Sequence, residues 1–212
     1  MKQRIVICTG GSLGPWALNH INEEDILIGA DSGARFLIEQ GYWPEIAIGD
    51  FDSVSPEEME QIRDRSHRTI ECDPIDKNYT DTEMAFRLAL DMKPACILLL
   101  GALGSRFDHS LSNIHLLNLA LESGIEAMVI DSNNCIRLIN DTTTITPSQY
   151  KQVSLLPLSL EVSGITLTGF QYPLRNATIK IGESIGISNV LLEEQGTIEL
   201  KQGHLLVIQS SD

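Results

Sequence analysis

Acidic side chains directly follow two apolar runs in the first quarter of the chain. Asp31 comes after residues 25–30, and Asp50 and Asp52 come after residues 45–49. If these runs are strands of one parallel sheet, their carboxyl ends meet at the edge where open α/β sheets bind ligands. The spacing therefore predicts several carboxylates at one edge of a sheet.

A group of carboxylates at one edge points to a divalent cation. Ionised carboxylates repel one another, and a hard cation with oxygen ligands relieves that repulsion. We predict that Asp50, Asp52 and Asp81 bind Mg²⁺. Each aspartate taken alone also fits an ordinary turn or a helix cap. For Asp31 both roles stay open, because a helix is expected to start at Ser32.

A second candidate element is the glycine-bearing loop that follows residues 96–101. It leads into a predicted helix near Asp108, and backbone N–H groups at a helix start can receive an anion. Arg106 adds a guanidinium that suits phosphate oxygens, and Lys77 adds another cation. The loop matches neither the P-loop nor the dinucleotide fingerprint. His109 lacks metal-ligand spacing, which favours a buried or capping imidazole over a zinc ligand.

The elements that must position these residues alternate between strands and helices up to about residue 131. Apolar runs separated by amphipathic stretches predict a parallel sheet flanked by helices, with a capping box at Ser55 and similar logic at Thr80. The predicted strands are residues 4–9, 25–30, 45–49, 69–72, 96–101 and 126–130.

The remainder of the chain has a different texture, with short β-branched runs and frequent turns. This pattern predicts a smaller antiparallel all-β domain, a sandwich of the jelly-roll type. We place an α/β domain at residues 1–134 and the β domain at residues 135–212, with a hairpin turn at Lys201-Gln202-Gly203. The predicted strands are residues 136–140, 152–156, 165–168, 177–181 and two within 196–209.

Composition excludes several classes of function. The net charge of −14 and the lack of a basic block disfavour nucleic-acid binding. The apolar runs are far shorter than the roughly 20 residues of a membrane span, and no signal-peptide core is seen, so we expect a cytoplasmic protein without membrane contact. None of the 4 cysteines has the spacing of a C-x-x-C pair, and we expect all of them to be reduced thiols.

The motifs together resemble the thiamine pyrophosphokinase family over nearly the whole chain. In the first domain they are Gly29-Ala30-Asp31-Ser32-Gly33, Gly49-Asp50-Phe51-Asp52-Ser53, Asp76-Lys77-Asn78-Tyr79-Thr80-Asp81 with Glu83, and Gly101-Ala102-Leu103-Gly104 followed by Arg106-Phe107-Asp108-His109. In the second domain they are residues 168–174 and Gly186-Ile187-Ser188-Asn189. One departure is Asn78, where that family usually has an acidic residue.

This resemblance implies an α/β domain that binds Mg-ATP, a β domain, and a homodimer whose active sites lie between subunits. The implied magnesium ligands are Asp50, Asp52 and Asp81, and the implied thiamine contacts are Tyr172, Ser188 and Asn189. The residues expected near the ATP phosphates are Asp31, Ser32, Lys77, Thr80, Arg106 and His109. The expected catalytic residues are Asp52, Asp81, Arg106 and Asp108.

The implied reaction moves the diphosphate of ATP to the hydroxyl of thiamine and releases AMP, with Asp108 or Asp31 as candidate proton acceptors. Three alternatives stay open at this point. They are a phosphatase of the haloacid-dehalogenase type that uses Asp50 and Asp52, a pyrophosphokinase for another alcohol such as a hydroxymethyl-pterin, and a non-catalytic nucleotide or thiamine sensor. The third-strand position of the acidic pair argues against the phosphatase.

Overall fold

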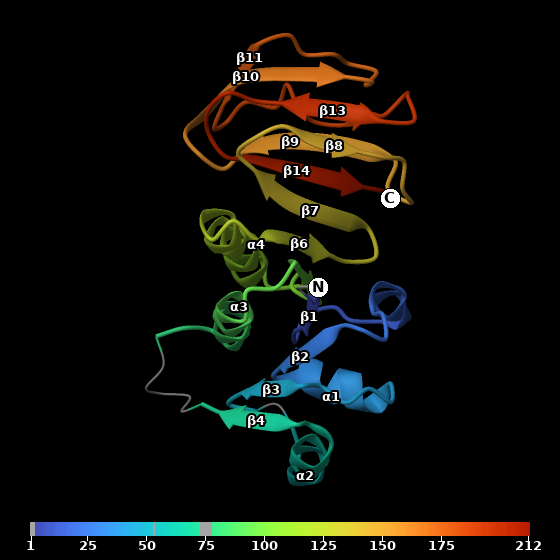
Figure 1. Ribbon diagram of the computed structural model, residues 1–212, viewed down its shortest axis with the longest axis vertical. Coiled ribbons are helices and arrows are strands. Elements are labelled where there is room, and N and C mark those ends of the chain that lie inside the picture. Colours follow the sequence, from blue (N-terminus) through green and yellow to red (C-terminus); the bar gives the residue numbers. More distant parts are fainter. Residues whose placement is uncertain (1–2, 53, 73–77) are drawn as a thin grey trace. The chain divides into compact units, whose positions relative to one another are not determined.

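The structure is a computed structural model that describes residues 3–52, 54–72 and 78–212 (Figure 1). The chain forms two compact units, which divide between Ser132 and Asn133. No helix within the described ranges is long and apolar enough to cross a membrane.

The first unit is built on six parallel strands, which confirms the predicted α/β class. They are β1 (Ile5–Cys8), β2 (Ile26–Ala30), β3 (Ile46–Gly49), β4 (Arg68–Glu71), β5 (Cys96–Leu100) and β6 (Glu126–Ile130). Their order in the sheet is β6-β5-β1-β2-β3-β4. The central strands are continuous apolar runs because helices cover both of their faces, whereas β4 is a partly exposed edge strand.

Helices join these strands and lie on the two sides of the sheet (Figure 1). They are the 3-10 helix η1 (Pro15–His20), α1 (Ser32–Glu39), α2 (Pro56–Arg65), α3 (Asp81–Asp91) and α4 (Phe107–Glu122). Right-handed crossovers place α1 and α2 on one face, and they place α3 and α4 on the other because the chain there moves across the sheet in the opposite direction.

The helix starts follow the sequence signals closely. At α2 the Ser55 hydroxyl accepts from the Glu58 N–H at 3.2 Å, and the Glu58 carboxylate accepts from the Ser55 N–H at 2.7 Å, so the predicted capping box is confirmed. At α3 the Thr80 hydroxyl accepts from the Glu83 N–H at 3.2 Å. Each bond satisfies a backbone donor that has no partner within its helix.

The second unit is a sandwich of two antiparallel sheets, as predicted. Its strands are β7 (Asn134–Ile139), β8 (Thr143–Ile145), β9 (Gln152–Pro157), β10 (Glu161–Thr168), β11 (Ala177–Lys180), β12 (Asn189–Val190), β13 (Gly196–Glu199) and β14 (Leu205–Ser210). One sheet runs β12-β9-β14-β7 and the other runs β11-β10-β13-β8. Alternate residues of both sheets, such as Leu155, Val162 and Val207, form the core between them.

The predicted hairpin at Lys201-Gln202-Gly203 is wrong in its pairing. β13 pairs with β10 and β8, whereas β14 pairs with β7 and β9, so the turn carries the chain from one sheet to the other. Each strand directs apolar residues to one face, Ile198 in β13 and Leu205 with Val207 in β14, and placing the strands in opposite sheets buries these residues in the core. Short spacing across a glycine turn cannot distinguish a hairpin from such a crossing.

Candidate active site

The candidate site lies at the carboxyl edge of the first unit, where the strand order reverses. The chain steps from β1 toward β4 on one side and returns through β5 and β6 on the other, so the switch point lies between β1 and β5. A cavity of about 300 Å³ opens there. Open α/β sheets bind ligands at such points. The cavity is lined by Thr9, Gly10, Gly11, Ala30, Asp31, Thr80, Asp81, Thr82, Gly101, Ala102, Gly104, Ser105, Arg106, His109, Ser110 and Asn113.

The loop after β1 is fastened directly to the loop after β5. The Gly11 N–H donates to the Gly101 carbonyl at 2.9 Å, and the buried Thr9 hydroxyl donates to the same oxygen at 2.6 Å. A Cβ on Gly11 would lie 2.1 Å from the Gly101 oxygen, so a side chain is sterically excluded at this position. The two loops therefore form a rigid, glycine-lined wall.

Helix α4 holds the same loop from its other side. The Ser110 hydroxyl accepts from the Gly104 N–H at 3.1 Å and donates to the Arg106 carbonyl at 3.1 Å. The Asn113 amide donates to the Ala102 carbonyl at 2.8 Å, and this side chain is only 7% exposed. The loop is thus shaped before any ligand arrives, which lowers the ordering cost of binding.

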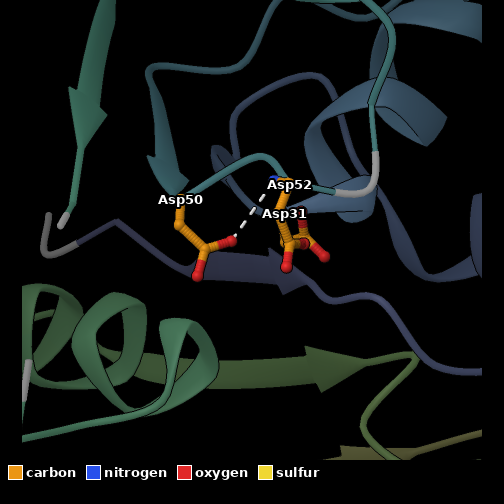
Figure 2. Close-up of side chains that lie close together, drawn as sticks. All are labelled: Asp31, Asp50 and Asp52. Atoms are coloured by element: carbon orange, nitrogen blue, oxygen red, sulfur yellow. Dashed lines mark hydrogen bonds between the residues drawn. The ribbon is translucent and has the colours of Figure 1, made fainter. Parts of the chain in front are cut away.

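Three carboxylates converge at the ends of β2 and β3 (Figure 2). Oxygen atoms of Asp31, Asp50 and Asp52 all lie within 4.8 Å of one another. The sequence had placed Asp31 near phosphates or at a helix cap, and its side chain makes no capping hydrogen bond to α1. Three carboxylate oxygens are a donor set that suits a hard divalent cation such as Mg²⁺.

The backbone turns sharply on both sides of this acidic cluster, by which we mean Asp31, Asp50 and Asp52. Asp31 has a φ of 51° and Phe51 has a φ of 53°. The Phe51 side chain is 6% exposed and packs in a cluster beneath α1 and α2 with Ile38 and Ile62. The Asp52 N–H donates to Asp50 Oδ1 at 3.3 Å. Burying Phe51 therefore directs its two neighbours toward the edge of the sheet, at the cost of a strained conformation.

A bidentate ion pair stands at the start of α4. Arg106 contacts Asp108 through Nε at 3.2 Å and through a terminal nitrogen at 2.6 Å. This hydrogen bonding, followed by the His109 N–H, lowers the pKa of Asp108, and the pair raises the pKa of Arg106. Both side chains are largely exposed, so the guanidinium is accessible to a ligand in the cavity.

The other predicted site residues of the first unit are distributed around the same edge. Asp81 begins α3 and lines the cavity with Thr80, but it lies outside the acidic cluster. The Ser32 hydroxyl lies 2.9 Å from the position of a Cβ on Gly10. Asn78 is exposed and does not cap α3, because Thr80 does. The predicted cation Lys77 lies outside the described residues.

In the second unit the three predicted thiamine contacts lie close together. The buried Asn189 side chain hydrogen-bonds to the backbone of Tyr172, at 3.0 Å from its N–H and 2.7 Å to its carbonyl. Tyr172 is 58% exposed. Ser188 is exposed, has a φ of 56°, and donates its N–H to the Ser154 hydroxyl at 3.0 Å.

Sequence reasoning missed the polar residues that shape the cavity wall. Thr9, Ser110 and Asn113 all line the cavity and hold its loops. The signal for Thr9 was present, because it follows β1 and stands before Gly10-Gly11. Ser110 and Asn113 could have been found from their spacing one turn apart on the first turns of α4.

Fold and site together define an α/β protein with a metal- and phosphate-suited edge, followed by a β-sandwich unit. Residues 17–129 match the model of the thiamin pyrophosphokinase catalytic domain, and residues 142–205 match that of the thiamin pyrophosphokinase vitamin B1 binding domain. The chain belongs to the thiamine pyrophosphokinase family.

Individual relatives agree with this assignment over their full length. A thiamine pyrophosphokinase of Bacillus subtilis is 33% identical over 98% of this chain and 99% of its own. A crystal structure of thiamine pyrophosphokinase from Bacillus subtilis superimposes with a TM-score of 0.92 at 33% identity, covering 99% of this chain and 100% of that one. A thiamin pyrophosphokinase structure from Geobacillus thermodenitrificans gives a TM-score of 0.90 at 33% identity, covering 99% and 98% of the two chains.

Proposed function

We propose that this transferase, a thiamine diphosphokinase by family, carries out its reaction at the carboxyl edge of the first unit. The thiamine hydroxyl oxygen forms a bond to the β-phosphorus of ATP, and the bond from that phosphorus to the oxygen bridging to the α-phosphorus breaks. AMP leaves, and the hydroxyl proton passes to a carboxylate at the same edge. The observation that supports this site best is the acidic cluster beside a glycine-lined cavity at the switch point.

We assign Mg²⁺ to Asp50 and Asp52, with Asp31 as the third carboxylate of the cluster. Bound there, the ion supplies positive charge that offsets the phosphate charge. Asp81 lines the cavity with Asp31, and we keep it as a ligand or a catalytic carboxylate on the opposite wall. The domain division proposed from sequence gives residues 1–134 to Mg-ATP and residues 135–212 to thiamine. Asp31, Asp50, Asp52 and Asp81 all lie in the domain proposed for the nucleotide.

The phosphates of ATP are proposed to lie along the cavity between the starts of α3 and α4. Helix N-termini and the loop backbone favour negative charge there, and Arg106 adds a fixed guanidinium. Thr80 and His109 are further polar side chains of this cavity, and Ser32 and Lys77 are proposed for the same role from sequence. Positioning and charge neutralisation supply most of the catalysis in such a transfer.

Asp108 is better suited to orienting Arg106 than to accepting the proton of the hydroxyl. The ion pair lowers the pKa of Asp108, which makes its carboxylate a weaker base. The same pair holds the guanidinium at the mouth of the cavity. We therefore propose that Asp108 acts through Arg106. Of the two candidate proton acceptors this leaves Asp31, which would take the proton only as a carboxylate of the cluster that is not bonded to Mg²⁺.

Thiamine is proposed to lie against the second unit, next to the exposed ring of Tyr172 and the exposed Ser188. We also propose a homodimer with active sites between subunits. Large exposed apolar side chains of the second unit, Tyr172, Ile185 and Leu192, support it, because a second copy would cover them. The 4 free cysteines support a reducing compartment, the cytoplasm.

The deciding experiment measures AMP and thiamine diphosphate after mixing the purified chain with ATP, Mg²⁺ and thiamine. We expect equal amounts of both products, and none without thiamine or with EDTA present. Inorganic phosphate without AMP would indicate a phosphatase instead. AMP release with a hydroxymethyl-pterin but not with thiamine would indicate a pyrophosphokinase for another alcohol, and thiamine binding without turnover would indicate a sensor.

A further inference from the structure

The Asn189 side chain is hydrogen-bonded through both its oxygen and its nitrogen inside the second unit. It is 4% exposed. Its Oδ1 accepts from the Tyr172 N–H at 3.0 Å and from the Val190 N–H at 2.9 Å, and its Nδ2 donates to the Tyr172 carbonyl at 2.7 Å. A buried amide with both of its ends bonded to backbone has a structural task.

That task follows from where the neighbouring backbone pairing stops. The Gln171 N–H donates to the Val190 carbonyl at 2.9 Å, and Phe170 forms a bridge with Leu191. At Tyr172 this pairing ends, and the Asn189 amide bonds to the Tyr172 N–H and carbonyl as a facing peptide group would. The side chain therefore extends the pairing by one residue and fixes the backbone that carries the exposed Tyr172 ring.

The segment that carries Asn189 is itself anchored. β12 pairs with β9 through Asn189 and Val190, and the Ser188 N–H donates to the Ser154 hydroxyl on β9. Ser188 has a φ of 56°, so the chain turns immediately before the buried amide. The backbone of Tyr172 is thereby tied through Asn189 to β9.

We infer that Asn189 is a positioning residue of the thiamine site, which acts by holding Tyr172 and does not itself bond to the substrate. The inference rests on the proposed function, in which Tyr172 contacts thiamine. It gives different roles to Ser188 and Asn189, which were both expected from sequence to contact thiamine, because Ser188 is exposed and Asn189 is buried. It also predicts that the effect of Asn189 on thiamine binding requires the Tyr172 side chain.

A double-mutant cycle tests this dependence directly. We expect Asn189→Ala to raise the KM for thiamine on the order of tenfold, with the kcat and the KM for ATP little changed. Asn189→Asp keeps the acceptor for the Tyr172 N–H but places a buried carboxylate oxygen against the Tyr172 carbonyl, so it should raise the KM for thiamine at least as much as Asn189→Ala. In a Tyr172→Ala background, Asn189→Ala should add nothing to the KM for thiamine. A further rise in that background would show a direct bond to thiamine and overturn the inference.

Amide hydrogen exchange provides a readout that does not depend on activity. The Tyr172 N–H should exchange faster in Asn189→Ala than in the unsubstituted chain, while amides of β10 remain protected. Unchanged Tyr172 exchange would overturn the inference even if the KM for thiamine rises. Failure of the proposed function would instead appear as absent thiamine-dependent AMP release in the unsubstituted chain.

Val162→Ala is a matched control for general weakening of the sandwich. Val162 is fully buried in the same core and lies in β10, outside the 169–172 and 188–192 segments. Its truncation should lower the unfolding temperature without raising the KM for thiamine. An equal rise in KM in Val162→Ala and Asn189→Ala would reduce Asn189 to a stability role and refute positioning.

Discussion

The two units prepare their candidate ligand groups by the same backbone device but with opposite chemistry. In the first unit, Phe51 adopts a φ of 53° between Asp50 and Asp52, and their carboxylates converge at the sheet edge. In the second unit, Ser188 adopts a φ of 56° beside Asn189, whose neutral amide is bonded internally. One unit presents charge, and the other uses its polar group to hold the backbone of Tyr172.

The two kinds of polar group suit different ligands. Clustered carboxylates repel one another, and a bound cation relieves that repulsion and in turn attracts phosphates. A buried neutral amide needs no counterion and leaves an aromatic face exposed, which suits an organic ring system. We therefore expect substitutions in the first unit to change metal and ATP dependence, and those in the second to change thiamine dependence.

The largest expected effect is that of removing charge from the acidic cluster. Asp52→Asn should lower kcat by about 100-fold or more, because charge stabilisation at the transferred group is lost. Mn²⁺ binding followed by electron paramagnetic resonance should weaken in parallel. Thermal unfolding without metal should stay unchanged, or shift slightly upward, because mutual repulsion decreases.

Asp81→Asn is the matched control, because it removes a carboxylate of the same cavity that lies outside the acidic cluster. Asp81 lines the cavity but lies outside the acidic cluster, so its loss should weaken Mn²⁺ binding less than the loss of Asp52. Equal loss of Mn²⁺ affinity in both variants would extend the metal site to α3. Full activity of Asp52→Asn would remove Asp52 from the site.

The next effect concerns the ion pair at the start of α4. Arg106→Lys keeps the charge but loses the bidentate fork, so the KM for ATP should rise by about tenfold or more. Asp108→Asn keeps the guanidinium but removes the carboxylate that holds it, so the KM for ATP should rise less than in Arg106→Lys. High salt should make the difference in KM between Asp108→Asn and the unsubstituted chain smaller still. A larger effect of Asp108→Asn on kcat than on the KM for ATP would instead support a direct role as base.

A smaller effect on activity, with a clear effect on stability, is expected at Phe51. Phe51→Ala removes a buried ring and should reduce the free energy of unfolding by about 3 kcal/mol. Phe51→Gly removes the same ring but relieves the positive φ, so it should be about as stable as the alanine variant or more stable. Urea unfolding measures both.

Leu117→Ala separates stability from positioning in that experiment. Leu117 is 1% exposed on α4, and its truncation should destabilise the same unit by a comparable amount. Mn²⁺ affinity should fall in Phe51→Ala and remain in Leu117→Ala. If both variants keep full Mn²⁺ affinity, Phe51 does not position the acidic cluster.

Much of the fold was predictable because it depends on local patterns. Continuous apolar runs such as Ile97 to Leu100 identify buried parallel strands, and Ser55 with Glu58 identifies the start of a helix. The turn at Lys201-Gln202-Gly203 was assigned to a hairpin wrongly, because which sheet a strand joins depends on packing against distant residues such as Val162. Sequence spacing carries no information on that choice.

The location of the candidate site was predictable from sequence, but which carboxylates come together there was not. The switch-point rule brings Asp31, Asp50 and Asp52 to one edge, yet only the positive φ of Asp31 and Phe51 groups their oxygens. The internal hydrogen bonding of Asn189 could not be predicted from sequence either, because the residue type does not show whether an asparagine side chain is buried or exposed. Backbone conformation and burial decide these roles.

The smallest expected effect is an absence of reactivity, and it tests how rigid the edge of the first unit is. Burial raises the pKa of Cys8, one residue before Thr9, from 9.0 to about 12. Since the raised pKa favours the neutral thiol in the folded state, stability from this group is complete below pH 9 and is lost as the pH rises toward 12.

At pH 8, iodoacetamide should label Cys8 only after denaturation, with and without Mg²⁺ and ATP, as read by mass spectrometry. The half-buried Cys96 on the same sheet is the internal control and should react faster. Rapid native labelling of Cys8 that Mg²⁺ and ATP suppress would mean that the ligands order this edge, and that the first unit is not held by its own hydrogen bonds as the second unit is.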